Sequence, residues 1–364
     1  MPARGEILLV AGARPNFMKV APLLEVLRRR GKLPCALVHT GQHYDPGMSD
    51  VFFHELGMPM PDVHLGVGSD SHARQTARIM TSFEAVVVER HPGAVLVVGD
   101  VNSTVACALV CAKMGIQVIH VEAGLRSGDR TMPEEINRLV TDQLSDFLFT
   151  PSEDAAPNLL REGIDPAKIH FVGNVMIDTL LRHLPLADQS TVLERLGLAP
   201  RGYVALTLHR PSNVDDAGSL GRLLEGLSRL PADLPIAFPV HPRTRERLAA
   251  MGAALPASLL LMDPLGYLDF MKLVKEARFV LTDSGGIQEE TTVLGIPCLT
   301  LRSNTERPVT VTEGTNILVG SDMNRMLEEA ARILAGHAKQ GGIPRYWDGR
   351  ASERIADVLE SSLA

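Results

Sequence analysis

The chain has 364 residues, a length that favours two domains. It is 45% hydrophobic and 22% charged, a composition typical of soluble globular proteins. The net charge of −7, without any long basic run, argues against nucleic acid or an anionic membrane surface as a partner.

Short apolar runs alternate with helical patterns along the whole chain. The apolar runs predict strands at 7–11, 35–39, 94–98, 117–121, 147–149, 203–208, 236–240, 279–282 and 298–301. Helical patterns lie at 20–30, 70–90, 103–114, from 132 onward, 287–294 and from about 350 to the end. Runs that are apolar throughout, separated by helices, are typical of parallel strands covered on both faces.

These elements predict an α/β fold of two doubly wound domains. We place the first at 1–180 and the second at 181–349, with the Pro-, Asp- and Gly-containing stretch 181–202 as the linker. The helix at 350–364 is expected to pack back on the first domain.

Charged and histidine side chains follow most of the predicted strands. They are Arg14, His43, Asp100, Glu122, His209, His241 and Asp283. Ligands of open α/β sheets bind at the carboxyl ends of the strands, so the set as a whole favours a ligand site. Each residue has a simpler alternative: Asp100 could cap a helix, Glu122 could pair with Arg126, and His209 could be a core histidine.

The stretch 279–308 combines a strand, a Gly-Gly turn and a helix. Ser284, Gly285 and Gly286 would place the free N–H groups of a helix N-terminus toward a phosphate. Glu290, one turn further on, suits the hydroxyl groups of a ribose, which donate hydrogen bonds. The alternative is an ordinary strand–helix unit with Ser284 as the helix cap.

Several common cofactor motifs are absent. There is no G-x-x-x-x-G-K-[ST] phosphate loop and no G-x-G-x-x-G after the first strand, so a bound dinucleotide is not predicted. No metal motif is present either, and we predict no cofactor and no metal. The cations Arg14, Lys19, Arg210 and Arg307, with the carboxylates Asp100, Glu122 and Glu134, instead suggest chemistry on a group attached to a nucleoside diphosphate.

The sequence favours a cytosolic location. It has no run of 18 apolar residues, and its first apolar run is too short for a secretory signal. The four cysteines lie in apolar contexts. Cys107 and Cys111 have helical spacing, but no further ligand completes a metal site, so buried free thiols are predicted.

Many motifs in one order carry a resemblance that covers nearly the whole chain. They are GARPNFMKVAP, TGQHYD, VVGDVNST, HVEAGLRS, MPEEINR, FVGNVMIDTL, TLHRPSNVDD, FPVHPRT, LTDSGGIQEE, LRSNTERP and WDGRASERI. The chain resembles the non-hydrolysing UDP-N-acetylglucosamine 2-epimerases. The resemblance implies two Rossmann-like domains in a glycosyltransferase-B-like arrangement, with the active site in the interdomain cleft. It also implies elimination of UDP to a glycal and re-addition after C2 is protonated on the other face.

The resemblance also implies roles for individual residues. Asp100, Glu122 and Glu134 resemble the catalytic carboxylates, and His209 the catalytic or diphosphate-contacting histidine. The UDP side comprises Arg14, Lys19 and Arg307 as cations, Ser284, Gly285 and Gly286 as the phosphate turn, Glu290 at the ribose and Phe270 at the uracil. Arg210 and His241 are added because they follow strands. A homodimer that serves polysaccharide biosynthesis is expected.

Some features depart from the family pattern. Some bacterial members bind a second substrate molecule as an activator through Gln-His-x-Gln and an arginine, where this chain has Asp45 and Ser69. GARPNF is similar to the corresponding stretch of relatives that act on UDP-2,3-diacetamido-glucuronic acid. The loop at 305–316 is instead similar to that of the family members that act on UDP-N-acetylglucosamine. A nucleotide-sugar glycosyltransferase and a non-catalytic nucleotide-sugar binding module are the remaining alternatives.

Overall fold

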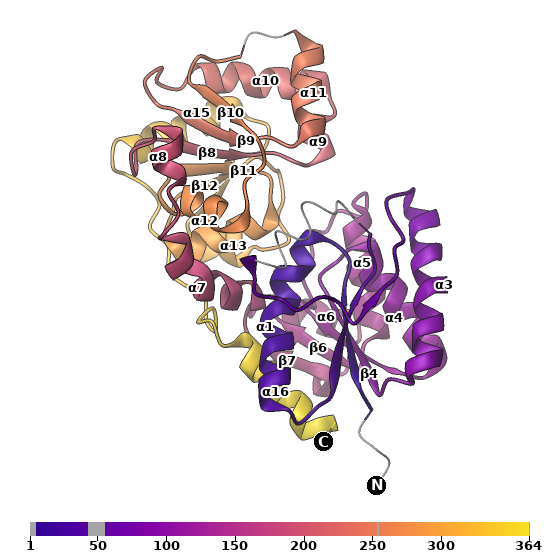
Figure 1. Cartoon of the computed structure of the whole chain (residues 1–364). Coiled ribbons are helices and arrows are strands. Elements are labelled where there is room, and N and C mark those ends of the chain that lie inside the picture. Colours follow the sequence, from indigo (N-terminus) through magenta and orange to yellow (C-terminus); the bar gives the residue numbers. More distant parts are fainter. Residues whose placement is uncertain (1–4, 43–54, 253–254, 364) are drawn as a thin grey trace. The chain divides into compact units, whose positions relative to one another are not determined.

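A computed structural model of the chain describes residues 5–42, 55–252 and 255–363 (Figure 1). The chain forms two compact units. Unit 1 is Met1–Arg182 with Arg345–Ala364, and unit 2 is His183–Pro344. The first boundary lies inside helix α7 (Val175–Ala187), and α8 (Val192–Leu196) follows closely. The stretch 181–202, predicted to be a linker, is therefore largely helical.

The described part of unit 1 contains a seven-stranded parallel sheet. Its order is β3-β2-β1-β4-β5-β6-β7. The strands are β1 Ile7–Ala11, β2 Cys35–His39, β3 Val63–His64, β4 Ala94–Val98, β5 Gln117–Val121, β6 Phe147–Thr150 and β7 Ile169–Phe171. The central strands β1, β4 and β5 end at the same edge, because the pairs β1–β4 and β4–β5 are parallel.

Helices connect these strands. They are α1 Arg14–Arg30, α3 His72–Arg90, α4 Asn102–Met114, α5 Pro133–Leu144, α6 Ala155–Arg161, a 3-10 turn at Pro166–Lys168, α7 and α16 Ala351–Leu363. Helix α1 begins six residues before the predicted start. Pro15 is tolerated there because the first turn of a helix lacks acceptors for its N–H groups. The Asn16 side chain completes this start by accepting hydrogen bonds from the N–H groups of Gly12 and Ala13.

The C-terminal helix α16 belongs to unit 1 and lies beside α1 (Figure 1). Arg30 pairs with Asp357 at 2.7 Å, and Lys32 pairs with Glu360 at 2.9 Å. The buried carboxylate of Asp178 accepts hydrogen bonds from the first N–H groups of α16. The end of the chain thus contributes to the unit that its beginning forms.

The described part of unit 2 contains a six-stranded parallel sheet of order β10-β9-β8-β11-β12-β13. The strands are β8 Val204–Thr207, β9 Ile236–Pro239, β10 Leu259–Met262, β11 Phe279–Thr282, β12 Cys298–Thr300 and β13 Asn316–Leu318. The helices are α8, α9 Pro211–Val214, α10 Ala217–Ser228, α11 Pro242–Met251, α12 Tyr267–Lys275, α13 Gly285–Leu294, α14 Val309–Thr312 and α15 Met323–Leu334.

Side chains from alternate positions of each central strand in unit 2 enter two separate apolar cores. Phe279 and Leu281 of β11 pack in one core, with residues of α10 and α15. Val280 packs in the other, with residues of α12 and α13. Because both faces of the sheet are buried, the strands read as continuous apolar runs. The predicted doubly wound α/β class is confirmed. None of the helices in the described ranges is long and apolar enough to cross a membrane.

Candidate active-site residues in the two units

In unit 1, Lys19 and Glu122 form a buried ion pair at the carboxyl edge of the sheet. Lys19 lies on α1, and Glu122 follows β5. Glu122 has a φ of 75°, which is rare for a residue with a side chain and concentrates at functional sites. Sequence reasoning placed Lys19 beside a phosphate. In the structure it has a carboxylate partner within its own unit.

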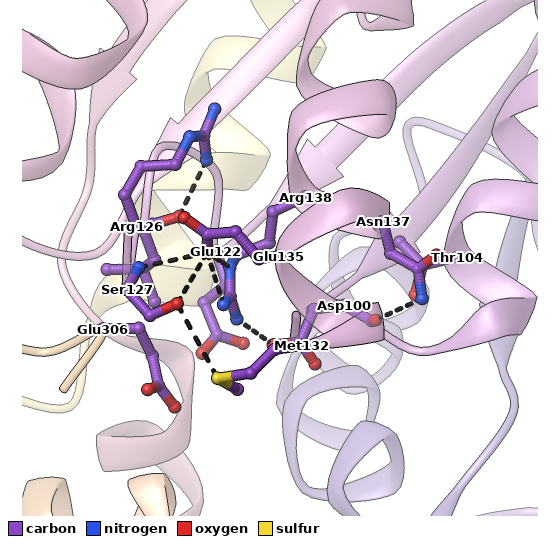
Figure 2. Close-up of polar contacts among 12 residues, drawn as sticks. Asp100, Thr104, Glu122, Arg126, Ser127, Met132, Glu135, Asn137, Arg138 and Glu306 are labelled. Atoms are coloured by element: carbon purple, nitrogen blue, oxygen red, sulfur yellow. Dashed lines mark hydrogen bonds and ion pairs between the residues drawn. The ribbon is translucent and has the colours of Figure 1, made fainter. Parts of the chain in front are cut away.

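Asp100 follows the neighbouring strand β4 and is held by a second buried cation, Arg138 of α5. Figure 2 shows Arg138 between Asp100 and Glu135. Arg138 is 2% exposed, and its Nη2 lies 2.6 Å from a carboxylate oxygen of Glu135. Asn137 donates to the Asp100 carbonyl at 2.8 Å. Both carboxylates nominated at strand ends are thus fixed by cations from neighbouring helices.

The sequence predicts a role for Glu134, whereas the adjacent Glu135 is the residue that joins this network. The Glu135 carboxylate accepts hydrogen bonds from the N–H groups of Ser127 and Gly128 and from Arg138. Burial works to raise its pKa, but these bonds outweigh it and hold the pKa below the ordinary value. Glu134 is half-buried and takes no part in this network among the described residues. The i,i+3 spacing of Glu135 and Arg138 was the signal that could have identified the pair.

In unit 2, Asp283 ties the end of β11 to the end of β8. This buried carboxylate accepts hydrogen bonds from the N–H groups of His209 and Arg210 and from the side chain of Asn213. The Nδ1 atom of His209 lies 2.9 Å from Asp283. Burial works to raise the pKa of Asp283, but the contacts with His209 and Asn213 bring it below its ordinary value.

The imidazole of His209 is 58% exposed. A hydrogen on Nδ1, donated to Asp283, leaves the lone pair of the neutral ring on Nε2. His209 is therefore oriented as a hydrogen-bond acceptor or base by a buried carboxylate. The alternative that it is a core histidine is wrong, because more than half of its side chain is accessible.

Helix α13 begins at Gly285, two residues earlier than predicted, with Ser284 at the cap position. The Ser284 side chain makes no capping hydrogen bond, so the N–H groups of the first turn are not capped by it. A Cβ atom on Gly285 would lie 2.5 Å from the Arg307 guanidinium and 2.7 Å from the Glu306 carboxylate. A larger residue at this helix start would require these two charged side chains to move.

Arg307 is buried and engaged by two carboxylates. Its guanidinium lies 2.7 Å from Glu289 and 2.6 Å from Glu306. Glu306 also pairs with Arg302 at 2.7 Å and lies 3.6 Å from Arg210. Burial works to raise the pKa of Glu306, but these arginines lower it far more. The predicted phosphate-side cations Arg210 and Arg307 thus share one internal carboxylate, which sequence reasoning did not anticipate.

Glu290, the predicted ribose ligand, is buried one turn into α13. Burial, reinforced by the neighbouring Glu289, raises the pKa of Glu290 to about 8. In the unfolded chain a glutamate titrates near 4.3, at about its ordinary value. The raised pKa therefore contributes stability that is complete at acidic pH and is lost as the pH rises through 8. Ionising this group inside the fold is unfavourable without a hydrogen-bond donor.

The remaining nominated residues occupy separate positions. Phe270 on α12 is half-buried and packs against the apolar core formed with α8. His241 is exposed and directly precedes α11. Arg14 is the first residue of α1, and its side chain, like His43, lies outside the described parts. No group of three or more His, Cys, Asp or Glu residues suited to a metal ion occurs in the described part of the chain.

Comparison with known sequences indicates a family of nucleotide-sugar epimerases. The sequence model of the UDP-N-acetylglucosamine 2-epimerase family matches residues 25–360. A UDP-N-acetylglucosamine 2-epimerase of Methanocaldococcus jannaschii is 40% identical, with 97% of this chain and 98% of the relative covered. A UDP-2,3-diacetamido-2,3-dideoxy-D-glucuronate 2-epimerase of Pseudomonas aeruginosa is 41% identical, with 97% and 99% covered.

Solved structures agree. The Methanocaldococcus jannaschii UDP-GlcNAc 2-epimerase in complex with UDP-GlcNAc and UDP has a TM-score of 0.90 at 39% identity, with 98% of this chain and 100% of that chain covered. A lipopolysaccharide outer core galactosyltransferase has a TM-score of 0.58 at 13% identity, with 98% and 99% covered, a likeness of fold alone.

Proposed function

The chain belongs to the UDP-N-acetylglucosamine 2-epimerase family, and from this premise we propose that it interconverts UDP-N-acetylglucosamine and UDP-N-acetylmannosamine. A base removes the proton from C2, the C1–O bond to UDP breaks, and a glycal with a C1=C2 double bond forms. Protonation of C2 on the opposite face and return of the UDP oxygen to C1 give the epimer. The reaction has no net oxidation, so it needs acid/base groups and stabilisation of the departing diphosphate.

The observation that carries this proposal is a pair of carboxylates on adjacent strand ends of unit 1. Asp100 and Glu122 each contact a buried cation, Arg138 and Lys19. A carboxylate held in a fixed position can take and return a proton at a defined atom. We assign proton transfer at the sugar to Asp100 and Glu122 together with Glu134.

We assign most of the UDP contacts to unit 2. The first turn of α13 offers backbone N–H groups and a positive dipole end to the diphosphate, with Arg210 and Arg307 beside it. His209, held by Asp283, contacts the diphosphate or transfers a proton. Glu290 accepts hydrogen bonds from the ribose hydroxyls, and Phe270 packs on uracil. The other residues that we assign to the nucleotide sugar are Lys19, Arg14, His241, Ser284, Gly285 and Gly286.

Incubation with UDP-N-acetylglucosamine in deuterated water tests the reaction. Deuterium at C2 of a manno product is the expected result. Sugar transfer only when an acceptor is added would support a glycosyltransferase, and binding without exchange would support a binding module. Because relatives named for two sugars match equally well, the same assay with the diacetamido-glucuronate substrate decides between them.

Replacing Glu290 by alanine is expected to weaken UDP binding by about 1–3 kcal/mol, the loss typical of charge-assisted hydrogen bonds. The ribose hydroxyls would otherwise donate to this buried carboxylate. Isothermal titration calorimetry with UDP measures the effect.

Two comparisons isolate the ribose contact. Since the pKa of Glu290 lies at about 8, UDP affinity of the unmodified protein should rise between pH 7 and 8, by about tenfold at most, with release of a proton. The rise should be absent with Glu290→Gln and with 2′,3′-dideoxy-UDP. Equal affinity for UDP and its dideoxy analogue in the unmodified protein would contradict the assignment.

Simple hyperbolic kinetics are expected, without activation by a second UDP-N-acetylglucosamine. The Ser69 hydroxyl donates to the Gln42 carbonyl at 3.4 Å and carries no charge for a diphosphate, and Arg78 nearby pairs with Asp70 at 2.8 Å. Asp45, an acid where the activator site needs an amide donor, lies outside the described residues. Prompt turnover of UDP-N-acetylmannosamine alone is expected. A lag removed by a trace of UDP-N-acetylglucosamine would show that activation persists.

A further inference from the structure

A fully buried histidine connects the elements that carry the proposed acid/base groups. His120 lies in β5, two residues before Glu122. Its Nδ1 lies 2.6 Å from an oxygen of Asp142 on α5, and its Nε2 lies 2.9 Å from the carbonyl oxygen of Gly99, which precedes Asp100. From its place in β5, this imidazole thus contacts α5 and the residue that follows β4.

Acceptor oxygens lie against both nitrogens of the ring. The Gly99 carbonyl can only accept a hydrogen bond, so Nε2 carries a hydrogen. The contact with Asp142 then needs one more proton, either on Nδ1 or on the carboxyl. Because Asp142 also accepts from the Gly124 N–H at 3.1 Å and from Arg126 at 2.7 Å, its ionised form is favoured. Both ring nitrogens therefore face an oxygen that can accept a hydrogen bond.

The charges around this ring are balanced. Asp142 is buried, which works to raise its pKa, but His120 and Arg126 bring the pKa below its ordinary value. Arg126 in turn binds Glu162 through Nε at 2.9 Å and Nη2 at 2.6 Å. Alternating positive and negative groups thus run from the strand toward the surface. Buried charges are tolerated when each has a partner of opposite sign and further hydrogen bonds.

Gly99 links this histidine to the proposed catalytic groups. Its N–H donates to the Val121 carbonyl, and its φ is 66°. A Cβ atom added to it would lie 2.9 Å from Lys19 Nζ and 3.4 Å from a carboxylate oxygen of Glu122. Gly99 therefore lies next to the Lys19–Glu122 pair and directly precedes Asp100 in the chain.

We propose that His120 is a positioning residue, which donates from its two ring nitrogens to the Gly99 carbonyl and Asp142 and so fixes Asp100 and Glu122 relative to each other. The expected effect on turnover rests on the proposed epimerase function, whereas the contacts of His120 do not depend on it. The charged groups around the ring are Asp142 of α5, Arg126 after β5 and Glu162 after α6, with Lys19 and Glu122 beyond Gly99.

The first experiment measures the ring itself. In protein labelled with 15N-histidine, long-range 1H–15N correlation spectra should show one histidine with both nitrogens protonated at a pH at which exposed histidines are neutral. This signal should change in Asp142→Asn. Spectra in which every histidine is neutral at that pH would overturn the proposal. The result does not depend on turnover, so it stands apart from the deuterium assay of the proposed function.

The second experiment measures the consequence. His120→Gln and Asp142→Asn should each lower kcat about 10- to 100-fold, because small displacements of catalytic groups reduce turnover by this much. The rates are normalised to the concentration of protein that binds UDP. The Kd for UDP should change less than about twofold, and the double variant should lose little more than either single one. His170→Gln, at a half-buried histidine of β7 in the same unit, is the matched control and should keep kcat. Unchanged kcat in folded His120→Gln, or fully additive losses, would overturn the positioning role.

Discussion

Replacement of Glu122 by glutamine is expected to lower turnover by roughly two orders of magnitude or more, the scale for removal of an acid/base group. Glutamine has nearly the same shape but cannot take up a proton. Its amide oxygen can still accept a hydrogen bond from Lys19, the buried partner of Glu122. Affinity for UDP should change far less, because most of the proposed UDP contacts, among them the first turn of α13 and Glu290, lie in unit 2. Asp100→Asn, at the neighbouring strand end, should have an effect of the same size.

Steady-state rates and UDP titration on the same preparations measure the two effects. Removing one partner of a buried pair can weaken the fold, so thermal unfolding must show that each variant is folded at the assay temperature. Glu84→Gln, at an exposed position of α3, is the matched control. If both variants lost UDP affinity and kept turnover, the division of roles between the units would be wrong.

Replacement of Arg138 by methionine is expected to destabilise unit 1 by about 3–5 kcal/mol, the usual cost of breaking a buried ion pair from one side. Arg138 is 2% exposed and contacts Asp100 and Glu135. Without it, Glu135 keeps the N–H groups of Ser127 and Gly128 but no longer has a cation. Turnover should also fall, because Asp100 loses the group that orients it. Denaturant unfolding measures the first effect and steady-state rates the second.

The pH dependence of this loss identifies its cause. The lowered pKa of Glu135 contributes stability that is present above its unfolded pKa and is lost as the pH falls through the folded pKa. The difference between the variant and the unmodified protein should therefore shrink under acidic conditions. Arg28→Met breaks a surface pair with Asp62 in the same unit and should cost less than about 1 kcal/mol. Equal losses in the two variants would show that burial of the Arg138 network contributes nothing.

The success and failure of strand prediction have one physical reason. Strands inside each sheet, such as β1 and β11, are buried on both faces and read as apolar runs, and the structure places them at their predicted positions. The missed strands β3, β7, β10 and β13 are the edge strands of the two sheets. They pair on one side only and are partly exposed, and three of them have only two or three residues. Weak burial leaves a weak pattern in the sequence.

The chain's own residues were enough to determine the doubly wound class and the family. Both can be read from local stretches of sequence. Burial of a strand on both faces produces an apolar run, and each family motif is a short continuous stretch. The partners of the site residues were decided by the tertiary structure alone. Lys19 meets Glu122 across 103 positions, and His120 meets the Gly99 carbonyl across 21. Such contacts depend on which strands become neighbours, and therefore on packing that no local stretch of sequence specifies.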